Sequence, residues 1–107
     1  MTNVFASAYH DGLLALQAAG SEKVKDAVFT PASGDPVDCL ILIGNEDEFQ
    51  PGITQAQAFI PTLFIDYQRI QIDREALRGE TFTAGETVYT VQRVTKKNQV
   101  KIRVAVK

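Results

Sequence analysis

Residues 87–107, TVYTVQRVTKKNQVKIRVAVK, decide the fold of this chain. Apolar residues occupy the even positions from Val100 to Val106 and alternate with Lys101, Arg103 and two further residues. This period of two predicts a strand with one face in a core and the other in solvent. Polar residues at 95–99 precede that strand and turn the chain, so the whole stretch predicts an antiparallel hairpin that closes a sheet.

Further strand-like runs precede this hairpin. Residues 24–30 and 37–43 flank the turn-forming segment PASGDP, and the second run is apolar enough to predict cover on both faces. Pro61 lies inside the next run, 58–67, and predicts a sheet edge or bulge there, because proline cannot donate a ladder hydrogen bond. With a short strand at 81–83, six or seven strands predict a mainly β (α+β) fold, a small antiparallel barrel or sandwich.

Helical spacing is confined to the N-terminus, over residues 3–19. The residues that recur at intervals of three or four are Phe5, Ala8, Tyr9, Leu13 and Leu16. Thr2 or Asn3 is available as an N-cap, and Gly20 is a stop signal. Gly12 lowers helix propensity by up to about 1 kcal/mol, so we expect fraying or a break there. The apolar stripe predicts a helix that packs on the sheet.

Two segments between the strands complete the organisation. Residues 44–57, GNEDEFQPGITQAQ, are polar, follow neither period and predict a long internal loop. Residues 73–79 predict one helical turn, capped by Asp73 and ended by Gly79. The expected layout is a single domain, 1–107, with an N-terminal helix at 1–21 and a β-domain at 22–107.

Composition narrows the class of protein. The chain has 107 residues, 45% hydrophobic and 22% charged, values typical of one globular domain. No Lys or Arg precedes Lys23, which argues against a secretory signal, and no apolar run approaches the roughly 20 residues that span a bilayer. The lone cysteine, Cys39, lies in an apolar run and predicts a buried, inert thiol. We expect no membrane association and a cytoplasmic setting.

The formal net charge of −2 hides a division along the chain. Residues 1–66 carry two basic and nine acidic residues, a net charge of −7, whereas residues 67–107 carry nine basic and four acidic residues, a net charge of +5. A weakly acidic protein is a poor candidate for wrapping duplex DNA. The division instead predicts two surfaces of opposite sign.

No pattern in the sequence indicates catalysis. His10 lies beside Asp11 in the predicted helix, where adjacent side chains point in different directions. One histidine and one cysteine cannot supply the four ligands of a structural zinc site, and the acids at 46–48 lack the order of a calcium loop. The chain contains no phosphate-binding glycine loop, dinucleotide-binding turn or serine-nucleophile elbow. We therefore expect neither an enzyme nor a bound cofactor or metal.

A small barrel that binds single-stranded nucleic acid is the alternative from a different class. The basic residues of the final hairpin would suit backbone phosphates; they are Arg93, Lys96, Lys97, Lys101, Arg103 and Lys107. Such barrels also stack bases on exposed aromatic rings. This hairpin offers only Tyr89, whose alternation with Val91 predicts a core position. A solvated basic face is the simpler interpretation.

From Ile60 onward, the order of features resembles a known family. A strand at 63–65 is followed by RGETF at 78–82 and GETVYTV at 85–91, with Val94 before the closing hairpin. This order resembles the small head-tail joining (tail attachment, head completion) proteins of long-tailed, lambda-like phages. The resemblance covers residues 60–107 well and residues 1–59 only in general layout.

The resemblance implies a phage or prophage virion assembly protein that joins the DNA-filled head to the tail. It would bind the portal-side connector, meet tail-terminator proteins and form a homo-oligomeric ring, with nucleic acid near it only through the DNA exit channel. Its place would be the virion, and the host cytoplasm during assembly. Another phage tail or baseplate structural module is the alternative within the same biology.

The charge division predicts how neighbouring copies meet in such a ring, whose interface joins two different patches of one subunit. The expected partner-binding residues are Glu46, Asp47, Glu48, Phe49, Lys101 and Arg103. We expect the three acids to approach the two bases of the next copy. The phenylalanine is expected to anchor the long loop, either on a partner or against the barrel.

Overall fold

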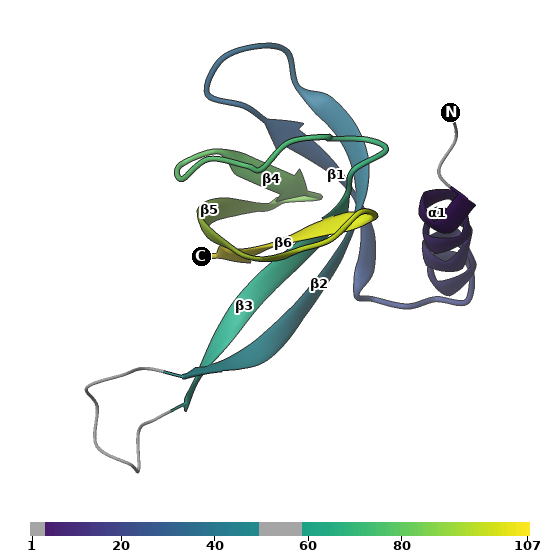
Figure 1. Cartoon of the computed structure of the whole chain (residues 1–107), viewed down its shortest axis with the longest axis horizontal. Coiled ribbons are helices and arrows are strands. Elements are labelled where there is room, and N and C mark those ends of the chain that lie inside the picture. Colours follow the sequence, from purple (N-terminus) through teal and green to yellow (C-terminus); the bar gives the residue numbers. More distant parts are fainter. Residues whose placement is uncertain (1–3, 50–58) are drawn as a thin grey trace.

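The computed structural model describes residues 4–49 and 59–107. Their order of elements is α1 (Val4–Ala18), β1 (Val24–Thr30), β2 (Val37–Phe49), β3 (Phe59–Gln68), β4 (Thr81–Ala84), β5 (Thr87–Lys97) and β6 (Lys101–Val106). The strands form a closed antiparallel barrel in the order β1-β2-β3-β6-β5-β4 (Figure 1). The predicted mainly β fold with one N-terminal helix is confirmed.

Aromatic side chains from three strands fill the centre of the barrel. The rings of Phe29 and Phe82 lie with their centroids 4.9 Å apart, and Tyr67 lies 5.3 Å from Phe82. All three are at most 1% exposed, and each comes from a strand whose alternate residues point inward. Tilted ring pairs at these separations add specific contact energy to the burial of apolar area.

The final strand behaves on one face as its alternation predicts. Ile102, Val104 and Val106 are buried in the barrel core. The other face is not the solvated face that we expected, because Ala105 is also buried and the basic residues between them are only partly exposed. A second layer of contacts therefore covers the outside of β6.

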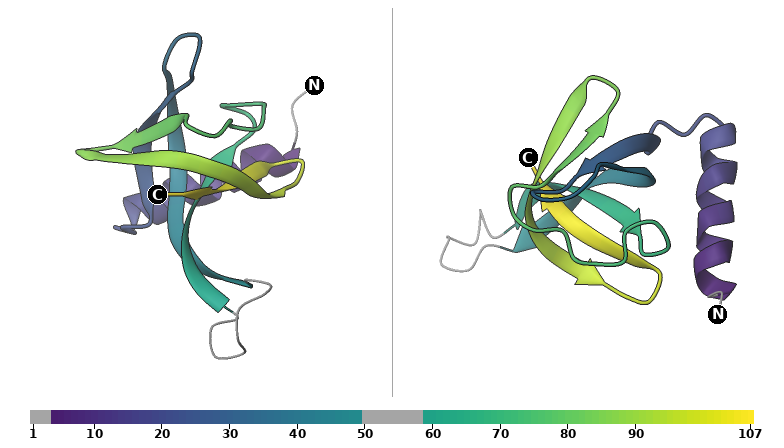
Figure 2. Two further views of the ribbon diagram at one scale, coloured as in Figure 1. Left: turned by 90° about the vertical axis from the view of Figure 1, so that its left-hand side faces the viewer. Right: turned by 90° about the horizontal axis from the view of Figure 1, so that it is seen from above.

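Helix α1 stands beside the barrel and covers part of the outer surface of β1 and β2 (Figure 2). Leu13 is buried in a small cluster with Val24 and Leu40, which confirms that the helix packs on the sheet and that both faces of β2 are covered. Leu16 is 48% exposed and takes no part in this cluster. The contact is thus narrower than the predicted stripe.

The helix ends where the sequence indicates. Gly20 adopts a φ of 90°, and the Ser21 amide donates to the Leu16 carbonyl, the bond pattern of a glycine-terminated helix. The helix continues through Gly12, so the expected break there is wrong. The proposed N-cap residues, Thr2 and Asn3, lie outside the described residues.

The segment between β3 and β4 is not the helical turn that residues 73–79 predicted. It is an irregular connection held by side chains. The Tyr67 hydroxyl donates to the Arg74 carbonyl at 2.7 Å and accepts from the Ala76 amide at 2.8 Å. These long-range bonds satisfy the backbone and replace the local bonds of a helix.

The β2–β3 pair extends beyond the barrel as a two-stranded arm (Figures 1 and 2). We define the arm as residues 45–49 and 59–63, which pair only with each other among the described strands. Residues 44–49 of the predicted loop are therefore strand, and its remainder, 50–57, lies outside the described residues. Residues 45–48 are all polar and carry no apolar alternation, which explains why this part of β2 was not predicted as a strand. The prediction that Pro61 lies at a sheet edge is confirmed.

Candidate partner-binding site

The structure places the acidic residues of the predicted site on the arm. Glu46, Asp47 and Glu48 lie in β2, paired in register with Thr62, Pro61 and Ile60 of β3. Phe49, the expected anchor, is the last residue of β2 and pairs in register with Phe59, the first residue of β3. The acidic triplet therefore projects from the barrel on a regular strand.

The basic residues of the predicted site lie on β6 and share one carboxylate. Asp66 accepts from Arg103 Nε at 2.7 Å and Arg103 Nη2 at 3.0 Å, and from Lys101 Nζ at 3.0 Å. Its side chain is fully buried, whereas those of Lys101 and Arg103 are 32% and 17% exposed. Strand register explains the geometry, since Asp66 stands directly opposite Arg103 and Lys101 is two residues further along the same face.

Lys101 and Arg103 thus hold the barrel wall together in addition to any role toward a partner. A buried carboxylate without a cation would carry a large desolvation cost, and these two cations compensate it. No buried side-chain nitrogen or oxygen among the described residues lacks a hydrogen-bond partner. The predicted contact of these bases with the acids of a second copy stays a prediction.

Two aromatic rings lie against the same cations. The Arg103 guanidinium lies 3.9 Å from the centroid of the Phe64 ring, and Lys101 Nζ lies 5.6 Å from that of Tyr9 on helix α1. Burial, reinforced by the nearby charge of Asp66, raises the pKa of Tyr9 to about 12. Helix α1 therefore contacts the outside of β6 through the Tyr9 ring, whose hydroxyl stays protonated at neutral pH.

Phe64 also joins this cluster to the base of the arm. A Cβ on Gly44 would lie 2.7 Å from Cζ of the Phe64 ring, so only glycine leaves room for it. The ring is held between the β2 backbone and the Arg103 guanidinium. The arm begins directly beyond Gly44 and Phe64, the residues that form this contact.

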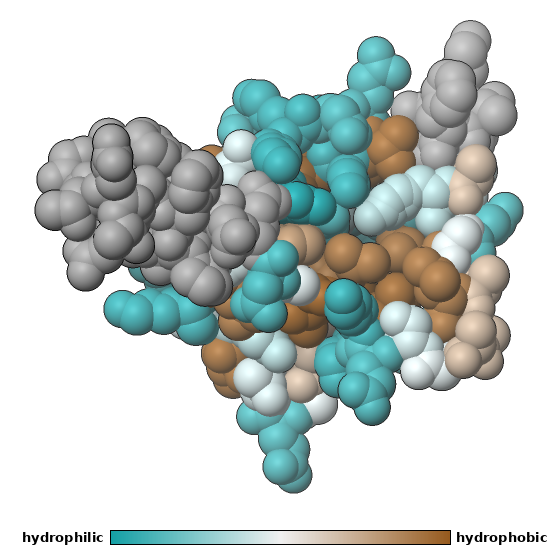
Figure 3. All heavy atoms as spheres, turned by 90° about the horizontal axis from the view of Figure 1, so that it is seen from below, coloured by the Kyte–Doolittle hydropathy of each residue, from teal (hydrophilic) through white to brown (hydrophobic). Residues whose placement is uncertain are grey.

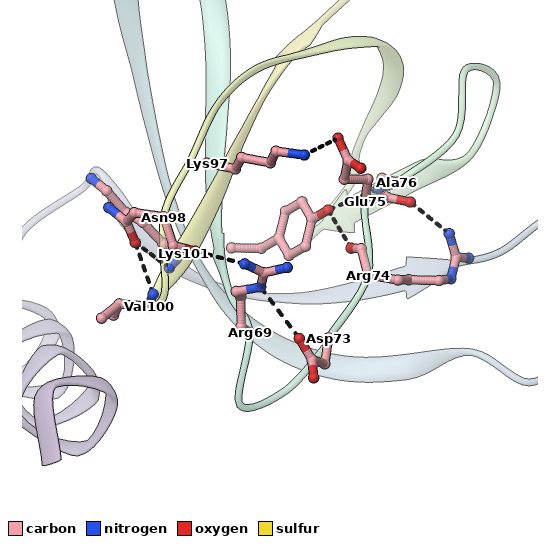
Figure 4. A network of polar contacts seen from close by, with 10 residues as sticks. Arg69, Asp73, Arg74, Glu75, Ala76, Lys97, Asn98, Val100 and Lys101 are labelled. Carbon is pink, nitrogen blue, oxygen red and sulfur yellow. Dashed lines mark hydrogen bonds and ion pairs between the residues drawn. The ribbon is translucent and has the colours of Figure 1, made fainter. Parts of the chain in front are cut away.

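A basic hollow of about 500 Å³ opens at the turn between β5 and β6. Its lining consists of Lys96, Lys97, Asn98, Lys101 and Arg103, and it contains no aromatic side chain. Figure 4 shows Lys97 reaching Glu75 and the Asn98 side chain turned toward Val100 and Lys101. A hollow with cations and no stacking ring suits carboxylates or phosphates better than nucleic-acid bases.

Asp66 is the central residue that we did not predict from the sequence. It lies in a strand whose neighbours, Ile65 and Tyr67, are fully buried. A carboxylate at such a position needs a cation opposite, and the alternating bases of the final strand are the available source. Pairing the 58–67 strand with the final strand would have placed Asp66 opposite these bases.

The RGETF segment proves to be a structural junction. Glu80 accepts from Arg74 Nη1 at 2.9 Å and Nη2 at 2.7 Å, and from the amides of Leu77 at 2.6 Å and Ala32 at 2.9 Å. The hydrogen bonds from Arg74 are the main cause that lowers the pKa of Glu80 to about 2. This carboxylate ties the β1–β2 turn to the connection before β4.

A second hollow, of about 540 Å³, lies between helix α1 and the outer face of β1 and β2. His10 borders it, and its Nδ1 lies 3.1 Å from the side-chain oxygen of Gln68. Cys39 also borders it but is buried, and desolvation raises the pKa of its thiol to about 11. The predicted burial of this thiol is confirmed, and the raised pKa is the opposite of the lowered pKa that a reactive cysteine has.

The described residues contain neither a metal-binding cluster nor a membrane-spanning helix. No group of three or more His, Cys, Asp or Glu side chains within 4–49 and 59–107 is placed to hold a metal ion. In the same part of the chain, no helix has the length and hydrophobicity to cross a bilayer. The residues predicted to bind a partner, on the arm and on β6, are the candidate site.

A scan against protein-family models and a search of curated proteins find no match to this sequence.

Proposed function

We propose that this chain is a phage or prophage virion assembly protein that joins the head to the tail as a subunit of a ring. The observation that carries the proposal is the acidic two-stranded arm on an otherwise closed barrel. Closure pairs the barrel strands with each other and leaves them little edge for a partner. The arm, by contrast, needs cover, because an isolated pair of strands is only marginally stable in water.

The distribution of charge supports a ring rather than a symmetric dimer. The arm carries Glu46, Asp47 and Glu48, whereas the basic hollow lies at the β5–β6 turn on the side of the barrel that faces α1 (Figures 1 and 2). Two different patches on one subunit favour head-to-tail contacts, which close into a ring when the rotation permits. The acidic arm of one copy would then approach the basic hollow of the next.

The glycine-containing segments that carry the family resemblance are compatible with the proposal. Gly79 and Gly85 adopt φ values of 93° and 62°, so each turn needs a residue without a side chain. Val91 is fully buried and Tyr89 packs against the same core, as the pattern predicts. The same segments would serve other tail or baseplate modules, which stay the alternative within phage biology.

The gene neighbourhood and a joining assay test the proposal. We expect a portal or capsid gene on one side of this gene and tail genes on the other. Filled heads made without the chain should fail to bind tails until the purified protein is added. Normal joining without the chain would overturn the proposal, and a neighbourhood free of virion genes would count equally against it.

Charge reversal on the arm tests the predicted contact. The variant Glu46→Lys, Asp47→Lys and Glu48→Lys should lose ring assembly and joining. A matched control, Asp11→Lys, Asp35→Lys and Glu86→Lys, changes the net charge equally at exposed positions away from the arm and should join as the wild type does. Equal activity of the two variants would contradict the arm contact.

A gel-shift assay at increasing salt separates the nucleic-acid alternative. Binding through phosphates weakens steeply as salt rises. We expect the chain to show no tight binding to single-stranded DNA at moderate salt. Tight, salt-sensitive binding that survives reversal of the arm would favour the alternative.

A further inference from the structure

Backbone hydrogen bonds fix the direction in which each residue of the arm presents its peptide groups. The Ile43 amide donates to the Lys23 carbonyl at 2.7 Å, toward β1, and the Arg69 amide donates to the Val100 carbonyl at 2.9 Å, toward β6. In an antiparallel ladder, residues i and i+2 direct their backbone groups to the same neighbour. Odd-numbered residues of β2 therefore face the β1 side, and odd-numbered residues of β3 face the β6 side.

In the arm, these same backbone groups form two outer edges. The ladder of β1 with β2 ends at Leu42, and that of β6 with β3 begins at Phe64. Pro61 is odd-numbered, so its missing N–H falls on the outer edge of β3 and leaves the inner ladder intact. The β3 edge is thereby blunted. The β2 edge keeps the amides of Asn45 and Asp47 as outward donors.

The charge on β2 selects the partner for this edge. A second copy is disfavoured there, because antiparallel pairing of two β2 edges about Asp47 would set Glu46 opposite Glu48 of the other copy. Like charges directly opposite destabilise a strand pair, whereas opposite charges stabilise it. The third strand that fits this edge is therefore basic.

We propose that the outer edge of β2, residues 45–49, binds an extended basic segment of a partner protein by adding it as a third strand of the arm. Main-chain hydrogen bonds to Asn45 and Asp47 give affinity, and cationic side chains at alternate positions of the added strand complement the charges of Glu46 and Glu48. This inference rests on the proposed function and adds a second contact to it: a basic segment of another protein binds the β2 edge, whereas the contact proposed with the next copy joins the acidic residues of the arm to that copy's basic hollow.

A proline substitution tests strand addition separately from charge. Asp47→Pro removes the outward donor at the position that Pro61 faces across the ladder, so the arm should tolerate it. Asp47→Asn removes the charge but keeps the donor. The probe is the peptide Lys-Thr-Lys-Val-Lys-Thr-Lys, and the control is the same peptide with methylated backbone nitrogens.

We expect the peptide to bind the wild-type chain and to protect the amides of Asn45 and Asp47 from hydrogen exchange. Asp47→Asn should weaken binding severalfold, and Asp47→Pro should weaken it by about a further tenfold, the cost of one lost hydrogen bond. Unchanged binding by Asp47→Pro would overturn strand addition, as would equal binding of the methylated peptide. Self-association of the chain through the same amides would also overturn it.

These outcomes are distinguishable from failure of the proposed function. If the joining assay succeeds while the peptide does not protect the arm, only the strand-addition mode is wrong. If the peptide binds as expected while joining proceeds without the chain, the edge site stands and the virion role falls. The amide spectrum of the barrel, unchanged in Asp47→Pro, verifies that the variant is folded.

Discussion

The barrel and the arm are built from the same two strands and differ in what their residues contact. Within the barrel, Ile41 and Ile65 of β2 and β3 are fully buried in the core. Beyond Gly44, the same strands pair only with each other among the described strands, and β2 becomes acidic. In the function that we propose, the barrel supplies stability and the arm meets a partner.

One face of the molecule, seen from below, carries an apolar band (Figure 3). Figure 3 shows hydrophobic residues between two polar margins. Buried side chains of β3, such as Ile65 and Tyr67, belong to the barrel core, whereas Leu63 at the arm boundary is only partly buried. Burial therefore decreases along one strand as it leaves the barrel.

The largest effect should come from removing the buried carboxylate of the barrel wall. Asp66→Ala leaves Arg103, only 17% exposed, and Lys101 without their shared anion. We expect the free energy of unfolding to fall by about 4 kcal/mol, the usual cost of breaking a buried ion pair. Urea unfolding measures it, with the exposed Asp35→Ala as control. A loss near that of the control would show that the cluster does not stabilise the barrel.

The next effect concerns pH and the Glu80 junction. The pKa of Glu80 falls from 4.5 to about 2 on folding, so its contribution to stability is present above the unfolded pKa and is lost as pH falls toward 2. A shift of this size corresponds to about 3 kcal/mol. Unfolding measured between pH 6 and pH 2 should show a shallower acid loss for Glu80→Gln than for wild type. Glu86→Gln, in an exposed turn, should leave the profile unchanged; parallel profiles for all three proteins would contradict this role.

A smaller effect is expected at the base of the arm. Gly44→Ala forces a Cβ against the Phe64 ring, which Arg103 covers on its other side. Overpacking of this kind costs about 2 kcal/mol. Gly12→Ala is the matched control, because nothing lies within 4 Å of its added Cβ and alanine favours a helix. In thermal unfolding, Gly44→Ala should lower the midpoint temperature and Gly12→Ala should raise it. An unchanged midpoint for Gly44→Ala would mean that the Phe64 ring moves freely.

The smallest effect on stability should come from the arm itself. Reversing Glu46, Asp47 and Glu48 to Lys changes charges outside the core, and we expect the free energy of unfolding to change by less than about 1 kcal/mol. Urea unfolding of this variant beside the wild type checks it. A loss as large as that of Asp66→Ala would mean that the arm belongs to the stabilising part of the molecule.

Much of the fold could be predicted because its strands have a core face. The 24–30 strand was predicted with its observed bounds, and the closing hairpin within about three residues, since alternation marks both. The β2 half of the arm, residues 45–49, was missed because its polar sequence carries no such alternation, whereas the β3 half lies within the predicted 58–67 strand. Residues 73–79 were misassigned because distant side chains, above all Tyr67 and Glu80, decide their conformation.

The residues of the candidate site were singled out from the sequence, but their contacts were not predicted. Sequence charge singled out both the acidic triplet and the bases of β6. That Lys101 and Arg103 already share Asp66 depends on the register of β3 with β6, which no local pattern reveals. The same register places Phe64 beside Arg103 and so connects the barrel wall to the arm.

Hydrogen exchange of the chain, free and within the assembled joint, tests most directly whether the arm is where the partner binds. We predict that the amides of Asn45 and Asp47 gain strong protection on assembly, whereas barrel amides such as those of Ile41 and Ile65 are protected in both states. Unchanged exchange along the arm, with new protection confined to α1 or to the outer surface of the barrel, would contradict the account.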